Sequence, residues 1–485
     1  MGCDDRRLHD AVRAAVVAAA GLAACVPRGD PFPSDPEPPL CEPVRARAPA
    51  ECASGGPLPA ETVFEGGGWP TGFGWECDGD AVVRSAGLCR SLDGGATFEQ
   101  PAPLPDVPAS TFYLSGTTFG GSAERVFFPA QAGDSVVLHA TDDGGETWRT
   151  SLPIGPAAPY ADYFQLATRG AEVVVGWRAY DATFGAENDA LWVARSFDRG
   201  ETFDAAVRAD DGAFPVAALS PGGPNPWGGP SMCVAGENAV VVGWRGQPGP
   251  TCGNVCAESG RVAVSVDGGP FRSTTLYEGR NSWTLAVACF ADGRAVAVWD
   301  ESAPVVENNG ARLGWAVMNT CGVWEPAAAL DGVIPPPLGP RFEHVVAGAT
   351  RALVHWSGAD VAPFAVLDAG GALVAGPIVA PDLDADGAGE GIADACATPG
   401  NRFAVLGYDY DGALAVTLVA ASLDADGGVL DGAVLGEVAL DVGVSGVPNV
   451  PARVWCDGRG RAHYLWADGW GVGGVARHVV RAVDP

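Results

Sequence analysis

Short apolar segments that end in an aromatic residue recur along the chain at a nearly constant interval. Six of them end at Trp177, Trp244, Trp299, Trp356, Tyr408 and Trp466, with spacings of 67, 55, 57, 52 and 58 residues. Two earlier segments, Val82-Val83 and Val126–Phe128, have the same apolar character. A period of this length indicates a repeat architecture in which each repeat forms one supersecondary unit.

Each repeat contains the pattern of four short strands. In the clearest copy, residues 282–330, the predicted strands are Trp283–Phe290, Ala295–Trp299, Arg312–Met318 and a fourth that begins at Val323. Four strands per repeat are typical of a β-propeller, whose blades bury both faces against their neighbours. We therefore predict an all-β fold with a single propeller of about eight blades, alternatively seven because the first two repeats are short. A strand at Glu61–Glu65 is expected to close the ring by pairing with the last repeat.

A turn motif, S-x-D-x-G-x-T-[FW], follows the third strand of several repeats. It occurs at Ser91–Phe98 and Ser196–Phe203, at Thr141–Trp148 with Thr in the first place, and in a degenerate form at Ser265–Phe271. An aspartate in such a turn accepts hydrogen bonds from the backbone N–H groups ahead of it, and glycine takes a positive φ at no steric cost.

These motifs resemble the Asp-box, or BNR, repeat of the sialidase-like β-propellers. The repeat pattern covers residues 60–483, and the sharp motifs cover about 90–271. The resemblance implies that the boxes lie on the face opposite any active site. A turn-capping role also explains why the four aspartates recur at one place in the repeat, so we expect them to be structural: Asp93, Asp143, Asp198 and Asp267.

The charge of the chain excludes one class of partner. The 485 residues carry a formal net charge of -30, and all 29 basic residues are arginines. Such a surface repels nucleic acids and anionic lipids, so we expect no nucleic-acid partner. The 68 glycines and 40 prolines fit many short strands joined by turns.

The N-terminal region has the features of an export signal. Residues 11–24 are small and apolar, and Leu22-Ala23-Ala24-Cys25 is similar to a bacterial lipoprotein processing site. We predict a signal segment at 1–25 with acylation of Cys25, a Pro-rich tether at 26–59 and the propeller at 60–485. The alternative is an Ala-rich export signal cleaved nearby. The predicted location is the cell envelope or outer surface, with membrane contact only through the lipid.

Five cysteines fall in or near the first strand of their repeats: Cys77, Cys233, Cys289, Cys396 and Cys456. One interpretation is that they are small buried hydrophobic residues. The other is that some form disulfides within or between blades, for example Cys77 with Cys89, since export favours disulfides. Cys252 and Cys256 are expected to bridge locally.

A ligand site on a propeller is expected where second strands end and first strands begin. There the candidate ligand-binding residues are Arg178, Arg245, Asp300, Arg341, Glu343 and Tyr408. Guanidinium groups bind carboxylates bidentately. The resemblance implies that a sialidase-like site would combine an arginine cluster with a Tyr–Glu pair, although the family's first arginine motif has no counterpart at 66–71. Asp300 and Glu343 are an alternative carboxylate pair for glycoside hydrolysis.

An acidic loop near the C-terminal third offers a possible cation site. Its alternating carboxylates match the first half of a calcium-binding loop and comprise Asp382, Asp384, Asp386 and Glu390. Alternating carboxylates enclose a hard cation, and glycine permits the sharp turn between them. The alternatives are bound calcium and an acidic exposed loop.

Two functional classes remain after these exclusions. The favoured hypothesis is a non-catalytic surface module that binds a glycan or an extracellular protein on the face opposite the boxes. The second is an exo-acting glycoside hydrolase of the sialidase-like type. They differ in whether an arginine cluster and a close carboxylate pair converge in one pocket.

Overall fold

The computed structural model divides the chain into two compact units, Met1–Cys41 and Glu42–Pro485. It describes the following residues: 43–47, 58, 61–65, 71–74, 81–84, 88–93, 96–98, 120–122, 125–143, 145–157, 160–169, 171–180, 190–210, 212, 230–246, 258–280, 284–301, 311–325, 328–334, 343–356, 363–378, 381–384, 391–409, 415–439, 441–442, 448–449, 452–467 and 475–483. All of them belong to the second unit. No helix in these ranges is long and apolar enough to cross a membrane.

The second unit consists of antiparallel sheets, most of which have four strands in chain order. The first four sheets are β2 Thr71–Gly74, β3 Ala81–Arg84 and β4 Leu88–Ser91; β5 Gly120–Ser122, β6 Arg125–Ala132, β7 Ser135–Thr141 and β8 Arg149–Thr150, with β9 Gly155–Pro156 also on β7; β10 Tyr160–Arg169, β11 Glu172–Tyr180, β12 Ala190–Ser196 and β13 Val207–Arg208; and β14 Ser231–Ala235, β15 Ala239–Gly246, β16 Glu258–Val266 and β17 Arg272–Arg280.

The remaining four large sheets complete the series. They are β18 Leu285–Cys289, β19 Ala295–Glu301, β20 Ala311–Met318 and β21 Ala328–Ile334; β22 Glu343–Ala347, β23 Arg351–Trp356, β24 Phe364–Asp368 and β25 Leu373–Ile378; β26 Gly391–Ala397, β27 Phe403–Asp409, β28 Ala415–Leu423 and β29 Val429–Ala439; and β32 Ala452–Cys456, β33 Arg461–Ala467, β34 Val475–Ala482 and β1 Thr62–Glu65. A small ribbon pairs β30 Asp441–Val442 with β31 Pro448–Asn449.

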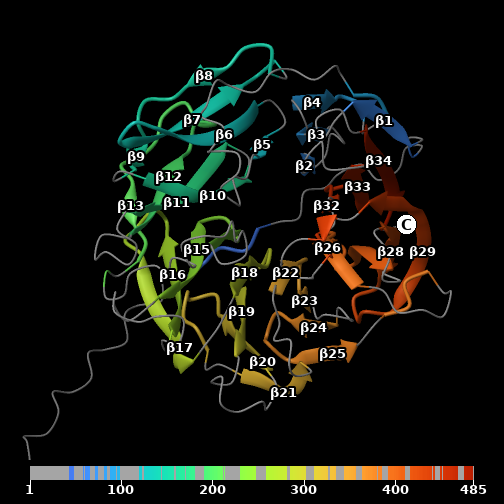
Figure 1. Ribbon diagram of the computed structural model, residues 1–485. Helices are drawn as coiled ribbons and strands as arrows, with labels where there is room; N and C mark the ends of the chain where they lie inside the picture. Colours follow the sequence, from blue (N-terminus) through green and yellow to red (C-terminus); the bar gives the residue numbers. More distant parts are fainter. Residues whose placement is uncertain are drawn as a thin grey trace, which may run out of the picture. The chain divides into compact units, whose positions relative to one another are not determined.

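The sheets follow one another around a centre, and the first strand of each lies on the inner side (Figure 1). First strands of successive sheets contact each other from β10 through β14, β18, β22 and β26 to β32. One hydrophobic cluster contains Val241 of β15, Val287 of β18 and Trp299 of β19, so the core lies between sheets. This packing explains why every residue of β15 is buried and why the second strands are continuous apolar runs.

The N-terminal strand closes the last sheet. Strand β1 pairs antiparallel with β34, and Thr62 lies opposite His478. The predicted closing strand is therefore confirmed, as are the second strands read from the apolar repeat. The predicted fourth strand of the repeat at 282–330 begins later than expected. Trp324 forms an isolated bridge, and the strand β21 itself starts at Ala328. The unit is an all-β propeller.

A five-residue segment, Pro43–Arg47, crosses the turns of the β14–β17 and β18–β21 sheets, and we call it the strap. The Val44 N–H donates to the carbonyl of Thr320 at 2.6 Å, and the Glu237 N–H donates to the carbonyl of Arg45 at 2.8 Å. The Val44 side chain is 4% exposed and belongs to the inter-sheet core. The strap lies inside the predicted 26–59 tether and packs against the propeller.

Two glycines make room for the strap. Gly236 has φ +54°, and a Cβ atom there would collide with the carbonyl oxygen of Arg45. Gly293 has φ +92°, and its Cβ atom would lie 2.7 Å from Cγ1 of Val44. A side chain at either position is therefore unfavourable for both conformational and steric reasons.

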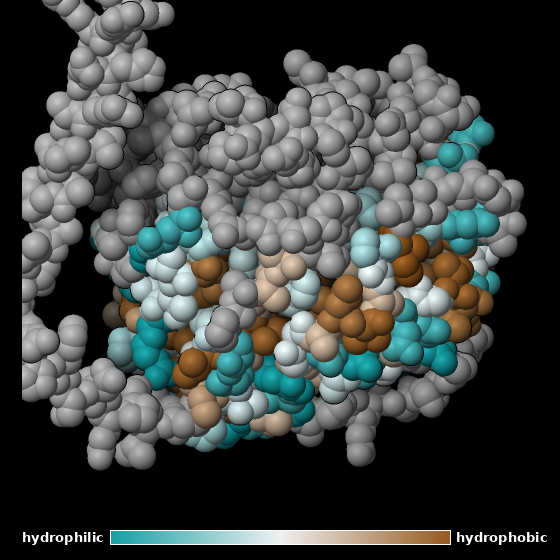
Figure 2. All heavy atoms as spheres, turned by 90° about the horizontal axis from the view of Figure 1, so that it is seen from below, coloured by the Kyte–Doolittle hydropathy of each residue, from teal (hydrophilic) through white to brown (hydrophobic). Residues whose placement is uncertain are grey.

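On one outer side of the unit, the described residues mix hydrophobic and hydrophilic side chains. Figure 2 shows hydrophobic residues mixed with hydrophilic ones on the side that faces downward in Figure 1. Exposed apolar side chains include Leu373, Val429 and Leu430. Apolar residues scattered in this way are normal on a soluble surface.

Candidate functional site

The strand order gives the propeller two functionally different faces. The box face carries the turns between third and fourth strands, where Asp143 and Asp198 lie, and the turns between first and second strands. The opposite face carries the starts of first strands and the ends of second strands, such as Asp162 on β10 and Arg178 on β11. Propeller ligands are expected at the second of these faces.

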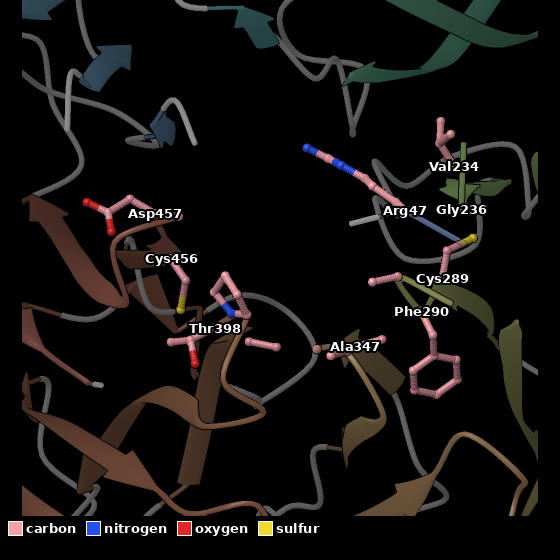
Figure 3. A pocket seen from close by; sticks show the side chains of 15 residues that line it. Arg47, Val234, Gly236, Cys289, Phe290, Ala347, Thr398, Cys456 and Asp457 are labelled. Carbon is pink, nitrogen blue, oxygen red and sulfur yellow. The ribbon is translucent and has the colours of Figure 1, made fainter. Parts of the chain in front are cut away.

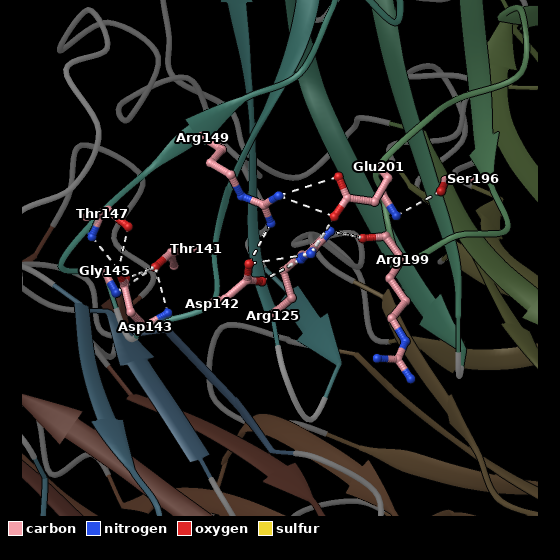
Figure 4. Close-up of polar contacts among 11 residues, drawn as sticks. Arg125, Thr141, Asp142, Asp143, Gly145, Thr147, Arg149, Ser196, Arg199 and Glu201 are labelled. Atoms are coloured by element: carbon pink, nitrogen blue, oxygen red, sulfur yellow. Dashed lines mark hydrogen bonds and ion pairs between the residues drawn. The ribbon is translucent and has the colours of Figure 1, made fainter.

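The carboxylates of the full boxes are bonded within their own turns. Asp143 accepts hydrogen bonds from the Thr147 N–H at 2.9 Å and from the Thr147 and Thr141 hydroxyls, and the Gly145 N–H donates to Thr141 Oγ1 (Figure 4). Asp198 makes the same set of bonds in the next sheet. These hydrogen bonds lower the pKa of Asp198 to about 2 and hold that of Asp143 below its ordinary range.

Asp93 and Asp267 show how far this pattern extends. The Thr97 N–H donates to Asp93 at 2.9 Å, as in the full boxes. Asp267 instead has a positive φ of 49° and accepts from Arg45 of the strap at 2.9 Å and from Asn238 Nδ2 at 3.0 Å. In the degenerate box the aspartate therefore binds the strap.

Neighbouring boxes are joined by an exposed network of arginines (Figure 4). Arg125 donates to Asp142 and Glu201, the latter at 2.7 Å, and also to the carbonyl of Arg199. Arg149 bonds the same two carboxylates. Because Asp142 and Glu201 belong to successive boxes, the network links two sheets across the surface.

On the opposite face, Arg178 forms an ion pair with a residue of the neighbouring strand. Its Nε and Nη2 atoms donate to the two oxygens of Asp162 at 2.8 and 2.6 Å, and both side chains are buried. Burial raises the pKa of Asp162, and the attraction to Arg178 opposes this rise. The guanidinium also lies over the ring of Tyr163, which has a positive φ at a β-bulge. The bidentate geometry expected for a ligand carboxylate is used here within the protein.

Arg245 and Asp300 lie at equivalent places on the next two second strands. Asp300 is fully buried and accepts from the Thr284 N–H at 2.8 Å. Arg245 is 3% exposed. In these conformations both side chains lie inside the protein, below the surface that a ligand would touch.

Three of the predicted ligand-binding residues remain to be compared with the structure. Tyr408 is 9% exposed, and burial raises the pKa of its phenol. Glu343 begins β22, but its side chain, like the whole of Arg341, lies outside the described part of the chain. The arginine cluster that the resemblance implies, for which Arg178, Arg245 and Arg341 are the candidates, therefore stays a prediction.

Asp394 is a polar residue of this face that the sequence analysis did not single out. It sits at a bulge in β26, where Oδ2 accepts from the Val454 N–H of β32 and Oδ1 from the Ala395 N–H, both at 3.0 Å. The crowded protein around His344 on β22 lowers the pKa of its imidazole, although the residue keeps exposed surface; the charge of Asp394 opposes this shift, and Arg453 on β32 adds to it. Three successive first strands thus bring a histidine, an aspartate and an arginine into electrostatic contact.

His344 also stacks on His355, its cross-strand partner in β23. The ring centroids are 5.2 Å apart and the planes differ by 12°. Burial keeps the pKa of His355 well below its ordinary value, so this imidazole is neutral at pH 7.

The predicted calcium loop is described only in part. Asp382 and Asp384 lie within the described residues, and Asp386 and Glu390 lie outside them. Over the ranges that the structure describes, no group of three or more His, Cys, Asp or Glu side chains could hold a metal ion. Calcium binding at 382–390 stays a prediction.

Two disulfides connect first strands of neighbouring sheets. Cys233 of β14 is bonded to Cys289 of β18, and Cys396 of β26 to Cys456 of β32. The interpretation of these cysteines as pairs between blades is therefore confirmed. Cys89 has a free and buried thiol, so the suggested Cys77–Cys89 pair is wrong. Disulfides persist in oxidising compartments, which indicates an exported protein.

A pocket of about 270 Å³ opens on the box face, where the first strands end (Figure 3). Its lining comes from the ends of five successive first strands and from the strap. The residues that contribute most to its chemistry are Arg47, Cys289, Thr398, Cys456 and Asp457. No sequence pattern marked this pocket, because its wall is made largely of backbone and small side chains.

The fold defines a β-propeller with one face whose turns are capped by aspartates and an opposite face that carries the buried Arg178–Asp162 ion pair. Neither a protein-family model nor a curated protein matches the sequence. Among solved structures, a Hadza microbial sialidase is 13% identical over 73% of this chain and 74% of its own, with a TM-score of 0.38. The NanB sialidase from Streptococcus pneumoniae is 7% identical over 87% and 94%, with a TM-score of 0.37.

A third similar structure is a puromycin hydrolase. It is 16% identical over 85% of this chain, with a TM-score of 0.45, and this chain spans 59% of its length. At these identities and scores the similarities carry no argument about activity. The assignment to the propeller class follows from the strand pairing.

Proposed function

We propose that the protein is an exported, lipid-anchored surface module that binds a glycan or protein ligand on the opposite face without chemical turnover. The observation that carries this proposal is that carboxylates of this face are already hydrogen-bonded within the protein. Asp162, Asp300 and Asp394 each accept hydrogen bonds from an arginine or from backbone N–H groups. A general acid or base must instead reach the substrate within hydrogen-bond distance.

The phenol of Tyr408 supports the same conclusion. A tyrosine nucleophile needs a neighbouring base or a lowered pKa to supply phenolate. Burial moves the pKa of Tyr408 upward, which disfavours phenolate. Binding requires no such ionisation, and His344, Arg453 and the surrounding loops could supply stacking and hydrogen bonds to a ligand. Acylation of Cys25 would hold this module at the membrane.

A glycoside hydrolase is the alternative function. Glu343 begins a first strand, β22, at the same face. Paired with a second carboxylate from the loops, it could provide acid–base chemistry. Only the hydrolase would cleave its ligand, so a measurement of turnover distinguishes the two functions.

Turnover and binding can be measured on the same full-length chain. We expect no release of fluorophore from a panel of fluorogenic glycosides that includes sialosides, and we expect specific retention on a glycan array or on a panel of extracellular proteins. Arg341→Ala and Arg453→Ala should each weaken retention at least about tenfold, since a lost charged hydrogen bond is worth about 1.5–3 kcal/mol. Arg149→Ala, on the box face, is the matched control.

Three outcomes would contradict the proposal. Turnover that Glu343→Gln abolishes would make the protein a hydrolase. Retention that falls equally in Arg149→Ala would move the ligand to the box face. A Cys25→Ser variant that stays in the membrane fraction as fully as the parent would remove the lipid anchor.

A further inference from the structure

The strap, Pro43–Arg47, lies in the sequence between the proposed lipid anchor and the strand that closes the ring. Cys25 precedes Pro43 by 18 residues, and it precedes Thr62, the first residue of β1, by 37. A pull on an acylated Cys25 therefore reaches the strap before it reaches β1. How far the pull is transmitted depends on how firmly the strap and β1 are each held.

Turns of two neighbouring sheets hold the strap, which is the short blue segment beside β15 in Figure 1. In the β14–β17 sheet, Oδ1 of the buried Asn238 accepts from the Arg45 N–H at 2.9 Å. In the β18–β21 sheet, the carbonyls of Ala291 and Thr320 accept from two further N–H groups of the strap, at 2.7 and 2.6 Å. Because the Val44 side chain is buried between the same sheets, polar and apolar contacts hold the strap jointly.

A disulfide joins the two sheets that hold the strap. It connects Cys233 of β14 to Cys289 of β18. These cysteines lie within five residues of Asn238 and Ala291, which bond the strap. A pull on the strap is thus passed to two sheets that cannot separate at this point unless a covalent bond breaks.

Strand β1 is attached at the edge of its sheet. It is the outermost strand in the order β1-β34-β33-β32, and it pairs with β34 over four residues, Thr62–Glu65. The ion pair between Glu61 and Arg477 just before this strand is exposed. Hydrogen bonds between antiparallel strands run perpendicular to them, so an edge strand that is pulled away from the sheet at one end loses its bonds one after another.

From this arrangement we infer that the strap is the mechanical fastening of the lipid tether, an inference that rests on the lipid anchor proposed above. While the strap is docked, the tether ends at Pro43 and spans at most about 65 Å from Cys25, because a chain covers no more than about 3.6 Å per residue. If it ended at β1, it would span up to about 130 Å. The strap thereby keeps the propeller near the membrane and keeps the pull of the anchor away from the ring closure.

Optical trapping of the full chain tests this inference. The handles are attached through Val26→Lys and Pro485→Lys, since the sequence contains no other lysine. In the parent, the strap should give way only at a force that β1 cannot bear, so the first event should also open the ring. It should therefore lengthen the chain by more than about 70 Å, the most that the 19 residues from Pro43 to Glu61 can span.

Val44→Asp places a charge in the apolar contact and should release the strap. At constant force, the time before the first event should shorten at least about tenfold, because burial of a valine is worth at least about that factor. Arg45→Gln is the matched control, because it removes an exposed ion pair with Asp267 and should change this time by no more than about threefold. Hydrogen exchange verifies the variants: the Glu237 N–H, which donates to the Arg45 carbonyl, should exchange faster in Val44→Asp, while the amides of β15 stay protected.

Two results would overturn the inference. One is a first event in the parent of at most about 70 Å that leaves the ring closed, and the other is an equal effect of Val44→Asp and Arg45→Gln. Because the handles replace the membrane, neither result depends on the lipid. The Cys25→Ser variant tests the anchor separately, so a chain that passes the trapping test while Cys25→Ser stays in the membrane fraction would keep the fastening and lose the proposed anchor.

Discussion

Two groups of ion pairs, one on each face of the propeller, use the same residue types in opposite ways. On the box face, Arg125 and Arg149 meet Asp142 and Glu201 at the surface, where water screens each pair. On the opposite face, Arg178 and Asp162 are 4% and 6% exposed, and their bidentate pair is shielded from water. The comparison teaches that burial, and not the number of ion pairs, decides how much stability depends on each charge.

Breaking the buried pair should have the largest effect. Asp162→Ala leaves the Arg178 guanidinium buried without its carboxylate, so we expect a loss of about 3–5 kcal/mol in the free energy of unfolding. Urea denaturation measures it. The double variant Asp162→Leu with Arg178→Met should recover most of this loss, since it removes both charges. A loss below about 1 kcal/mol in the single variant would show that water reaches the pair.

His463 is buried although it lies beneath the box face, so it tests the effect of burial independently of the face on which a group lies. His463 lies between Asp457 and His478, with its Nε2 3.3 Å from Asp457 Oδ2 and its Nδ1 3.1 Å from His478 Nε2. Trp455 stacks on both histidines. Burial lowers the pKa of His463, although Asp457 opposes the shift. Hydrogen bonds hold the pKa of Asp457 low despite its burial.

This arrangement predicts acid sensitivity in two windows. The unfolded chain binds a proton on His463 more readily than the folded one, so stability should fall as the pH decreases below about 6.5, by about 1.4 kcal/mol per unit of pKa difference. The stabilisation that Asp457 contributes is lost at lower pH. It declines as the pH falls below about 4, where the carboxylate is protonated in the unfolded chain, and it is gone below the lower pKa of the folded state. Urea midpoints between pH 8 and pH 3 measure both. In His463→Gln the contribution of His463 to the upper window should be lost, so the slope there should become shallower although the buried His355 still contributes; an unchanged slope would contradict the assignment.

The smallest effects are expected on the box face itself. Asp143→Ala removes several hydrogen bonds from one turn and should cost about 1–2 kcal/mol in urea denaturation. Asp142→Ala, at the adjacent position, breaks only exposed ion pairs and should cost at most about 1 kcal/mol. Raising the salt concentration should shrink the second loss and leave the first largely unchanged. Equal losses in the two variants would mean that the box aspartate is not a turn cap.

Much of the fold could be predicted because burial on two sides leaves a plain trace in the sequence. Residues such as Val173–Trp177 are apolar without alternation, and they form the interior of β11. The closing strand was visible because the last repeat lacked a fourth strand of its own. The strap was missed, since its bonds are made by backbone groups and its Pro-rich surroundings are typical of a tether.

The candidate site was less predictable for a related reason. Asp394 bonds the Val454 N–H from sixty residues away, and the Arg178–Asp162 pair depends on the bulge after Asp162. Register and bulges decide whether a polar residue at a strand end faces water or a neighbour, and the apolar period does not encode them. Residue type and approximate place on the strand were therefore predictable, but the partners were not.

The pairing of β1 with β34 also sets an order of events during synthesis. The outer strand of the closing sheet, β1, leaves the ribosome before the sheets in between, and the three strands it must join, β32 to β34, leave after them. Until then β1 has no partner in this sheet, and the sheets between can form before the ring does. Completion of the ring therefore follows synthesis of the sheets in between and joins segments about four hundred residues apart in the sequence, with a loop-closure entropy that grows only slowly with that separation. A chain halted before β34 would keep an unpaired strand exposed to other chains.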